Sequence, residues 1–332
     1  MIRQIATYEG RPVLEAVLES ATAQVSVLNY GCVIRDWRVQ AAGRVVPVVL
    51  GFDRFEDYPV HSKSFGIIAG RVANRTAHGR FTLNGETYQL ACNNGAHHLH
   101  GGDVGLGRRL WEMEADGAGL VLTYHSPDGE DGYPGAVTFE VKLRLDEGAL
   151  TFEMSGQPDR PTPINLAQHN YYNLEGGGDV REHILQIAAP HYTPVDAGLI
   201  PTGEILPVAG TRMDFTTPKR VTQEDPNLQG IDLNLVLEAE RDRSLPAVAL
   251  ESETTGLRLA LWTDEPGLQL FNAPQMDIPV PGIDGARYGR FAGLCLEAQH
   301  FPDSLNHPGW PSIIARPETP YHQRLVVEIG AG

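Results

Sequence analysis

Residues 137–154 read VTFEVKLRLDEGALTFEM, and this stretch decides the fold class. Apolar side chains occupy every second position from Val137 to Leu145, and the alternation resumes at Leu150 after a short turn. Successive side chains of a β-strand point to opposite faces of the sheet, so a period of two buries one face and leaves the other polar. The stretch therefore predicts an antiparallel hairpin with one face in the core.

The rest of the chain repeats this pattern in short apolar runs bounded by turn-forming residues. The 332 residues include 36 glycines and 24 prolines, and only residues 235–241 suggest a helical turn. No fixed-period repeat, low-complexity tract or linker marks a domain boundary. We therefore expect an all-β fold, a large antiparallel two-sheet sandwich with few or no helices, formed by residues 1–332 as a single domain. Besides the hairpin, the main predicted strands are residues 12–19, 24–29, 33–39, 45–50, 110–114, 120–125, 184–188, 248–252, 257–263, 268–271, 294–297 and 324–329.

The composition narrows the range of partners. The formal net charge is -16, which repels phosphate backbones and anionic lipid surfaces, so we expect neither nucleic acid nor membrane partners. The sequence begins without an apolar secretion segment and has no apolar run long enough to span a membrane, which favours the cytoplasm. The three cysteines, Cys32, Cys92 and Cys295, lack CxxC spacing, so neither a disulfide framework nor structural zinc is expected.

Residues 66–102, GIIAGRVANRTAHGRFTLNGETYQLACNNGAHHLHGG, combine an arginine-containing loop, a second hairpin and a histidine cluster. The Asn-Gly pair at 84–85 tolerates the positive φ angles of a two-residue turn, which places Phe81 opposite Tyr88. The hairpin is therefore expected to have a structural role, with one apolar face packed into the core. That face consists of Phe81, Leu83, Tyr88 and Leu90.

The two flanks of this hairpin are polar, and the hairpin would bring them together as a site. GRVANR at 70–75, the GxFxLxGxxYxL hairpin and the LHGG that follows it resemble the aldose 1-epimerases, also called galactose mutarotases. The resemblance implies a large two-sheet sandwich of the galactose mutarotase-like type, whose concave face holds a sugar. It also implies that Arg71, Asn74 and His100 contact that sugar.

A second segment, PTPINLAQHNYYNL at 161–174, resembles the PTP-N-NH-YFNL segment of the same family, in which the histidine is the catalytic acid. The resemblance assigns this role to His169. The segment departs from the family pattern at Gln168, where Asn is usual, at Asn170, where Ser or Thr is common, and at Tyr172, where Phe is common.

A third segment, LCLEAQ at 294–299 with FPDSLN following it, resembles the family's C-L-E-T-Q segment, whose glutamate is the catalytic base. An acidic residue at the end of an apolar strand is either exposed or tuned by a site, because burial raises a carboxyl pKa unless donors stabilise the carboxylate. The resemblance implies that Glu297 is the base and that Gln299 contacts the sugar.

A fourth segment, GIDLNL at 230–235, resembles the family's short Asp-His-Asn-Phe motif. The resemblance makes Asp232 an acceptor for sugar hydroxyls. Leu233 and Leu235 replace the usual histidine and aromatic residue, so contacts made by that histidine are not carried over.

The implied reaction interconverts the α and β anomers of free aldoses of the galactose and glucose class. A base takes the proton of the C1 hydroxyl while an acid protonates the ring oxygen, the ring opens, and the groups exchange roles as it closes on the other face. Glu297 and His169 suit these roles, with activity expected to fall below the pKa of Glu297 and above that of His169. No cofactor and no metal is expected, and the protein is expected to be a monomer or a homodimer.

Four alternatives remain at this point. His98 and His100 could share a strand face as metal ligands, with Glu297 or His169 completing a cupin-like site, although no glutamate closely follows the two histidines. Asp232 and Glu297 could form the carboxylate pair of a glycosidase. A non-catalytic carbohydrate-binding protein on the same fold would be expected to lack the acid or the base. An epimerase of phosphorylated hexoses would be expected to cluster arginine or lysine side chains.

Overall fold

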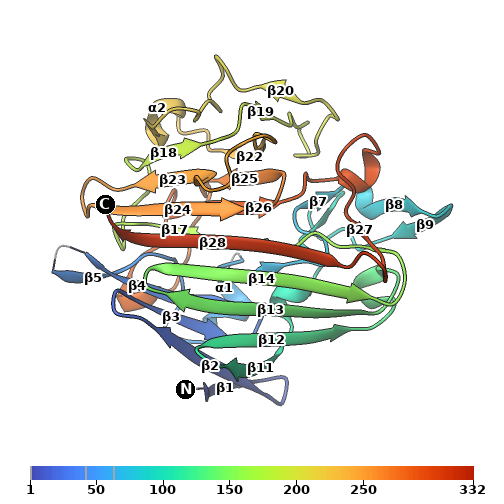
Figure 1. The fold of residues 1–332 in the computed structure, drawn as a ribbon, viewed down its shortest axis with the longest axis horizontal. Helices are drawn as coiled ribbons and strands as arrows, with labels where there is room; N and C mark the ends of the chain where they lie inside the picture. The colour runs from blue at the N-terminus through green and yellow to red at the C-terminus, as the bar shows by residue number, and fades with distance from the viewer. Residues whose placement is uncertain (1, 42, 63) are drawn as a thin grey trace.

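The computed structural model describes residues 2–41, 43–62 and 64–332, and its regular structure is nearly all β (Figure 1). The largest sheet has nine antiparallel strands in the order β11-β12-β13-β14-β28-β24-β23-β18-β21. Its strands are β11 (Glu112–Asp116), β12 (Gly119–Ser126), β13 (Val137–Asp146), β14 (Ala149–Pro158), β28 (Tyr321–Ala331), β24 (Leu257–Thr263), β23 (Val248–Glu251), β18 (Ile184–Ile187) and β21 (Lys219–Arg220).

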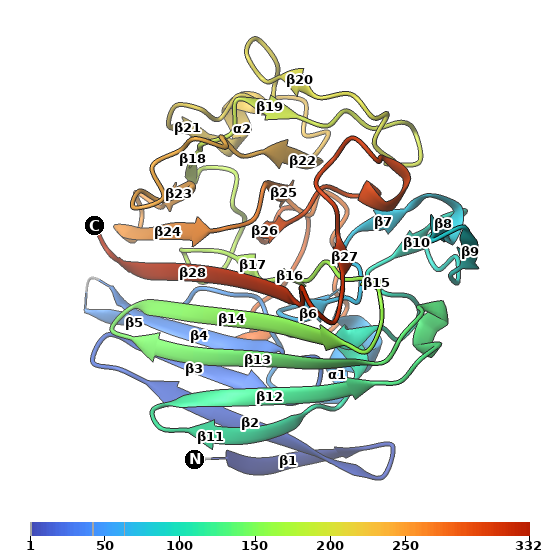
Figure 2. The same ribbon diagram turned by 45° about the vertical axis from the view of Figure 1, so that its right-hand side comes forward.

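Two further sheets form the layer that faces this large sheet. A five-stranded sheet runs β1-β2-β3-β4-β5, and a six-stranded sheet runs β17-β26-β25-β22-β19-β20 (Figure 2). One hydrophobic cluster contains buried side chains from all three sheets, so the two smaller sheets share one core with the large one. Their strands are β1 (Ile2–Tyr8), β2 (Arg11–Glu19), β3 (Ala23–Leu28), β4 (Ile34–Ala41) and β5 (Arg44–Pro47), then β17 (Tyr171–Tyr172), β26 (Leu294–Gln299), β25 (Gly267–Phe271), β22 (Asp232–Val236), β19 (His191–Tyr192) and β20 (Leu206–Pro207).

Short elements complete the described part of the chain. Four two-stranded ladders are β6 (Ile68–Ala69) with β16 (Ala167–Gln168), β7 (Arg75–Thr76) with β10 (His98–Leu99), β8 (Arg80–Leu83) with β9 (Glu86–Gln89), and β15 (Thr162–Pro163) with β27 (Ile314–Ala315). The α-helices of the described ranges are α1 (Asp57–His61) and α2 (Val221–Glu224), and neither is long and apolar enough to cross a membrane.

The all-β sandwich prediction is confirmed, and so is the hairpin that anchored it. Strands β13 and β14 pair over their whole length, with Leu145 opposite Leu150, and the alternate apolar positions are buried. The helical turn predicted at 235–241 is wrong, because its first residues belong to β22, where Leu233 and Leu235 are buried in the core. The facing layer also differs from a simple sandwich, since it consists of two sheets rather than one.

The second predicted hairpin is β8 and β9. Phe81 pairs with Tyr88, and their rings stack with centroids 5.2 Å apart. Asn84 and Gly85 have φ angles of 53° and 82°, as the two-residue turn requires. The neighbouring β7 and β10 ladder joins the two flanks of the hairpin, so the residues on either side of it meet as expected.

Strand β26 shows how the six-stranded sheet divides its two faces. Leu294, Leu296 and Ala298 belong to the shared core, so they face the nine-stranded sheet. Because side chains alternate along a strand, Cys295, Glu297 and Gln299 point to the opposite face. All three are nevertheless buried, which means that loops cover this second face. A carboxylate thus lies in a covered space outside the main core.

Candidate active site

Three neighbouring strands supply the floor of the site. In the register of β22, β25 and β26, Asp232 lies opposite Phe271 and Gln269 lies opposite Glu297. Adjacent strands are about 4.8 Å apart, so these side chains form one continuous surface. Gln269 Nε2 donates a hydrogen bond of 2.5 Å to Asp232 Oδ1. The sequence prediction missed Gln269, which lies between the two predicted carboxylates.

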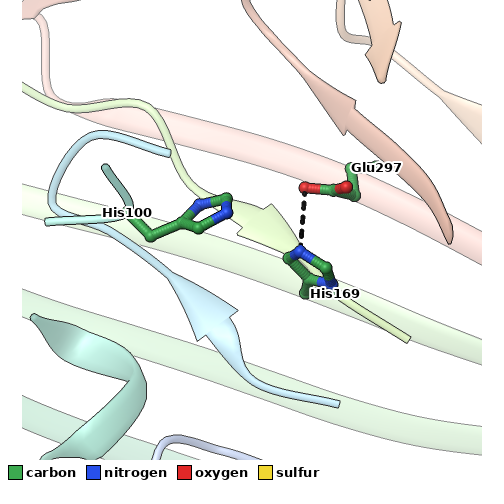
Figure 3. Close-up of side chains that lie close together, drawn as sticks. All are labelled: His100, His169 and Glu297. Atoms are coloured by element: carbon green, nitrogen blue, oxygen red, sulfur yellow. Dashed lines mark ion pairs between the residues drawn. The ribbon is translucent and has the colours of Figure 1, made fainter. Parts of the chain in front are cut away.

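His169 reaches this surface from the short link between β16 and β17. Tyr171 pairs with Cys295 of β26, and this pairing fixes the link beside the strand that carries Glu297. The imidazole stacks on the Tyr171 ring, with centroids 5.2 Å apart and an interplanar angle of 27°. Its Nε2 lies 3.6 Å from Glu297 Oε2, as the dashed line in Figure 3 marks. The structure therefore brings the predicted acid and base together.

His100 completes the cluster from the end of the β10 strand. Its φ of 50° turns the chain out of the strand, and its ring meets the His169 ring edge-on, with centroids 5.2 Å apart (Figure 3). The Asn74 backbone N–H donates to His100 Nδ1 at 3.1 Å. A neutral imidazole that accepts at one nitrogen carries its proton on the other, so His100 presents an N–H at Nε2.

This arrangement argues against the metal alternative. His98 does not join His100, because its Nδ1 lies 2.7 Å from the Ala91 carbonyl and its Nε2 lies 2.7 Å from the Tyr133 hydroxyl. Possible ligand atoms of His100, His169 and Glu297 do lie within 4.8 Å of one another. A metal needs a lone pair at each ligand, whereas the Asn74 amide leaves a proton on His100 Nε2. The trio suits a ligand with hydroxyl groups better than an ion.

The electrostatics of the cluster follow from its burial. Desolvation raises the pKa of Glu297 well above its usual value, the Asp232 carboxylate raises it further, and the Arg75 guanidinium opposes both. Desolvation lowers the pKa of His169 to about 4. It also lowers the pKa of His100 well below its usual value. Desolvation thus favours the uncharged forms of both groups, a protonated Glu297 carboxyl and a neutral His169 imidazole.

Glu297 has a carboxyl oxygen that can still form a hydrogen bond to a ligand. Its Oε2 atom is buried and accepts no hydrogen bond from any residue that the structure describes. A buried acceptor without a donor is costly, so such an atom indicates a missing partner. A hydroxyl group placed between Glu297 and His169 would supply that partner.

The structure places the Arg71 side chain away from the other predicted site residues. Its guanidinium is buried away from the cluster, where Nη2 donates to Ser126 Oγ at 2.7 Å and to the Pro127 carbonyl at 2.9 Å. Nη1 donates to the Gly135 carbonyl at 2.8 Å. These bonds join the loop to the end of β12 and to the segment after it. Arg71 therefore stabilises the loop, and the structure does not bring its guanidinium to the cluster of Glu297 and His169.

Arg75, four residues later, takes the place predicted for Arg71. Its Nη1 lies 3.7 Å from Asp232 Oδ2, and its Nε donates to Asn94 Oδ1 at 3.1 Å. Between the two arginines, Asn74 has a φ of 62° and accepts the Arg75 N–H on its own Oδ1 at 2.8 Å. Asn74 thus shapes the loop that presents Arg75 and fixes the tautomer of His100.

Gln299, another predicted sugar contact, is fully buried beyond Glu297 on β26. It lies on the same strand face as Glu297, but its side chain is completely buried, and its amide has no hydrogen-bond partner among the described residues. Its role as a sugar ligand stays a prediction.

A cavity of about 690 Å³ adjoins the cluster. This volume lies within the usual range of small-molecule sites, which are mostly apolar with a few convergent polar groups. Arg75, Tyr171, Asp232 and Phe271 belong to both the cavity wall and the site floor. The outer wall includes Asn94, Val195, Leu199, Arg212, Met213, Gln229, Pro274 and Met276.

Comparisons with known proteins agree with this geometry. The family model described as aldose 1-epimerase matches residues 16–328. Galactose mutarotase of Bos taurus is 38% identical over 309 residues, covering 92% of this chain and 90% of that protein. Aldose 1-epimerase of Escherichia coli is 33% identical over 314 residues, covering 91% and 90%. The crystal structure of an aldose epimerase homologue from C. elegans superposes with a TM-score of 0.90 at 28% identity, covering 96% of this chain and 99% of that one. The chain therefore belongs to the aldose 1-epimerase family.

Proposed function

We propose that the protein is an aldose 1-epimerase, which interconverts the α and β anomers of free aldoses of the galactose and glucose class. The observation that carries this proposal is the pair of Glu297 and His169. The two groups are buried, lie 3.6 Å apart, and leave a carboxyl oxygen open to a hydroxyl ligand. A carbohydrate-binding protein without activity has no need of such a pair.

The reaction needs only proton transfers. The Glu297 carboxylate takes the proton from the C1 hydroxyl, and the His169 imidazolium gives its Nε2 proton to the ring oxygen, so the C1–O5 bond breaks and the open aldehyde forms. After C1 turns about the C1–C2 bond, the same two groups return their protons as the ring closes. The pair enters and leaves each step with one proton. The 3.6 Å between Nε2 and Oε2 lets that proton lie on His169 once a bound hydroxyl stabilises the carboxylate.

The remaining side chains bind and orient the sugar. His100 donates its Nε2–H, and Arg75 donates from a guanidinium that Asp232 and Asn94 hold in place. Asp232 accepts from a hydroxyl, with Gln269 as its fixed neighbour.

We further propose that residues 1–332 act as one catalytic domain in the cytoplasm, as a monomer or a homodimer, without cofactor, nucleic acid or membrane partner. The site supports a single domain, since its side chains come from segments between residues 74 and 297. The net charge of -16 supports the absence of nucleic acid partners.

Polarimetry on freshly dissolved single anomers tests the function. We expect the purified protein, after exhaustive chelation, to accelerate the approach of α-galactose and α-glucose to anomeric equilibrium. Activity that disappears on chelation and returns with a metal would contradict the cofactor-free mechanism. Absence of acceleration with every aldose tried, including xylose and arabinose, would overturn the proposed function itself.

The pH dependence should be bell-shaped, with its limbs set by burial. Below about pH 4 His169 gains a proton while Glu297 is already protonated, so the pair holds two protons and no base remains. Above the raised pKa of Glu297 the pair loses its only proton, and no acid remains. The acid limb thus belongs to His169 and the alkaline limb to Glu297, the reverse of the sequence-based expectation.

Initial rates measured against pH, corrected for uncatalysed mutarotation, check this assignment. An acid limb near an ordinary imidazole pKa of about 6.5 would contradict it.

The two arginines should differ in what their loss affects. Arg75→Ala should lower kcat/KM by about ten- to a thousandfold, the scale of a lost charged hydrogen bond in a preorganised site, without lowering Tm. Arg71→Ala should lower Tm because it leaves several buried carbonyl groups without donors. Mutarotation kinetics and thermal melts of both variants make the comparison. Equal kinetic losses for folded variants would refute the placement of Arg75 at the sugar.

A further inference from the structure

We infer that Cys295 is a positioning residue for the reaction: its sulfur accepts the Nδ1–H of His169 and thereby keeps Nε2 as the nitrogen that exchanges the proton. This inference rests on the proposed function. Cys295 Sγ lies 3.7 Å from His169 Nδ1, and both side chains are buried. The pairing of Tyr171 with Cys295 fixes this contact, because it locks the backbone two residues from His169 against β26.

The two nitrogens of His169 have different tasks in the proposed cycle. Nε2, which faces Glu297, alternates between a bare nitrogen and an N–H. Nδ1 must carry its proton throughout, since a ring that is protonated at Nε2 when neutral could not accept a proton there. An N–H that never leaves needs a permanent acceptor in a buried site. Cys295 Sγ, 3.7 Å away, is the side-chain acceptor in that position, beside a hydrogen bond of the ring to the backbone of His169 itself.

The raised pKa of Glu297 favours the same tautomer. Burial favours its protonated carboxyl group, and its Oε2 lies 3.6 Å from His169 Nε2. A protonated carboxyl can donate to a bare Nε2, whereas two facing N–H and O–H donors would repel. His100 has the opposite tautomer. The Asn74 backbone N–H donates to its Nδ1, so its proton is on Nε2, which acts as a donor. Two adjacent imidazoles therefore carry opposite tautomers, one for binding and one for exchange.

Sulfur also suits the proton transfer because it is a weak acceptor. A carboxylate at Nδ1 would stabilise the imidazolium and hold the proton that must reach the ring oxygen. Burial raises the pKa of the Cys295 thiol well above its usual value, so the sulfur stays uncharged. The His169 ring contacts Tyr171 on its flat side, His100 on its edge, Glu297 and Cys295. A side-chain hydrogen bond also links Cys295 to Tyr171.

The test combines nitrogen-15 NMR of labelled histidines with kinetics. In the wild type without sugar, above the pKa of His169, we expect the His169 signals of a protonated Nδ1 and a bare Nε2, assigned by their loss in His169→Asn. Cys295→Val removes the acceptor and keeps a small apolar side chain, so the ring should shift toward the Nε2–H tautomer and kcat should fall about tenfold with KM little changed. Cys295→Ser restores an acceptor and should recover part of both. The control is Cys92→Ser, which alters an exposed cysteine.

An Nε2–H tautomer in the wild type would overturn the inference. So would a Cys295→Val variant that keeps the wild-type tautomer and kcat. Absence of mutarotation in the wild type would instead overturn the proposed function, and the tautomer spectrum would still decide whether Cys295 sets the ring of His169.

Discussion

Glu297→Gln should lower kcat for mutarotation by about a thousandfold, within the range of 10²–10⁴ that a positioned acid or base contributes, while KM changes only a few-fold. Glutamine has the shape of the protonated carboxyl group but cannot take the C1 proton. Because burial raises the pKa of Glu297 and so favours its uncharged form, the substitution adds no buried charge. Tm should therefore stay close to that of the wild type.

Polarimetric kcat and KM, together with a thermal melt, check this expectation. Glu153→Gln serves as the control, because it makes the same chemical change on the exposed face of β14. A folded Glu297→Gln variant with near wild-type kcat would place the base elsewhere, with Asp232 the next carboxylate in the site.

His169→Asn should lower kcat by a similar factor, about 10²–10⁴, because the ring oxygen loses its proton donor. Sugar affinity should largely survive, since His100, Arg75 and Asp232 remain. The smaller side chain also loses its stacking on Tyr171, so a modest fall in Tm is expected.

Binding of galactose, measured by calorimetry, separates the two effects. His322→Asn is the control, since this histidine lies exposed on β28. Loss of sugar binding in a well-folded His169→Asn variant would show that His169 binds the sugar rather than transferring a proton.

Much of the fold is local in origin, which is why the sequence predicts it. The alternation at 137–154 fixes which face of the hairpin is buried, and the Asn-Gly turn at 84–85 fixes its own register. The division of the second layer into two sheets is different. It depends on pairings between strands far apart in the chain, such as β17 with β26, which no local pattern encodes.

The sequence likewise predicts only those site residues that lie in recognisable motifs. His169 and Glu297 were found through family-like motifs, and the sheet register brings them together as the resemblance implied. Arg71 and Arg75 stand four residues apart in an irregular loop without a period of two or 3.6, so the sequence does not say which one lies beside Asp232. Gln269 carries no motif at all. Only its position opposite Glu297 in the β25 and β26 ladder reveals it.

We propose that Glu297 and His169 act as one proton-exchanging unit, and this coupling can be measured with a double variant. Initial mutarotation rates of α-galactose would be measured for the wild type, Glu297→Gln, His169→Asn and the double variant. If the groups act together, the double variant should be about as slow as the slower single variant, because losing either group already stops the exchange. Losses that multiply, with the double variant slower by the product of the single effects, would show that the two groups act independently and do not share the proton.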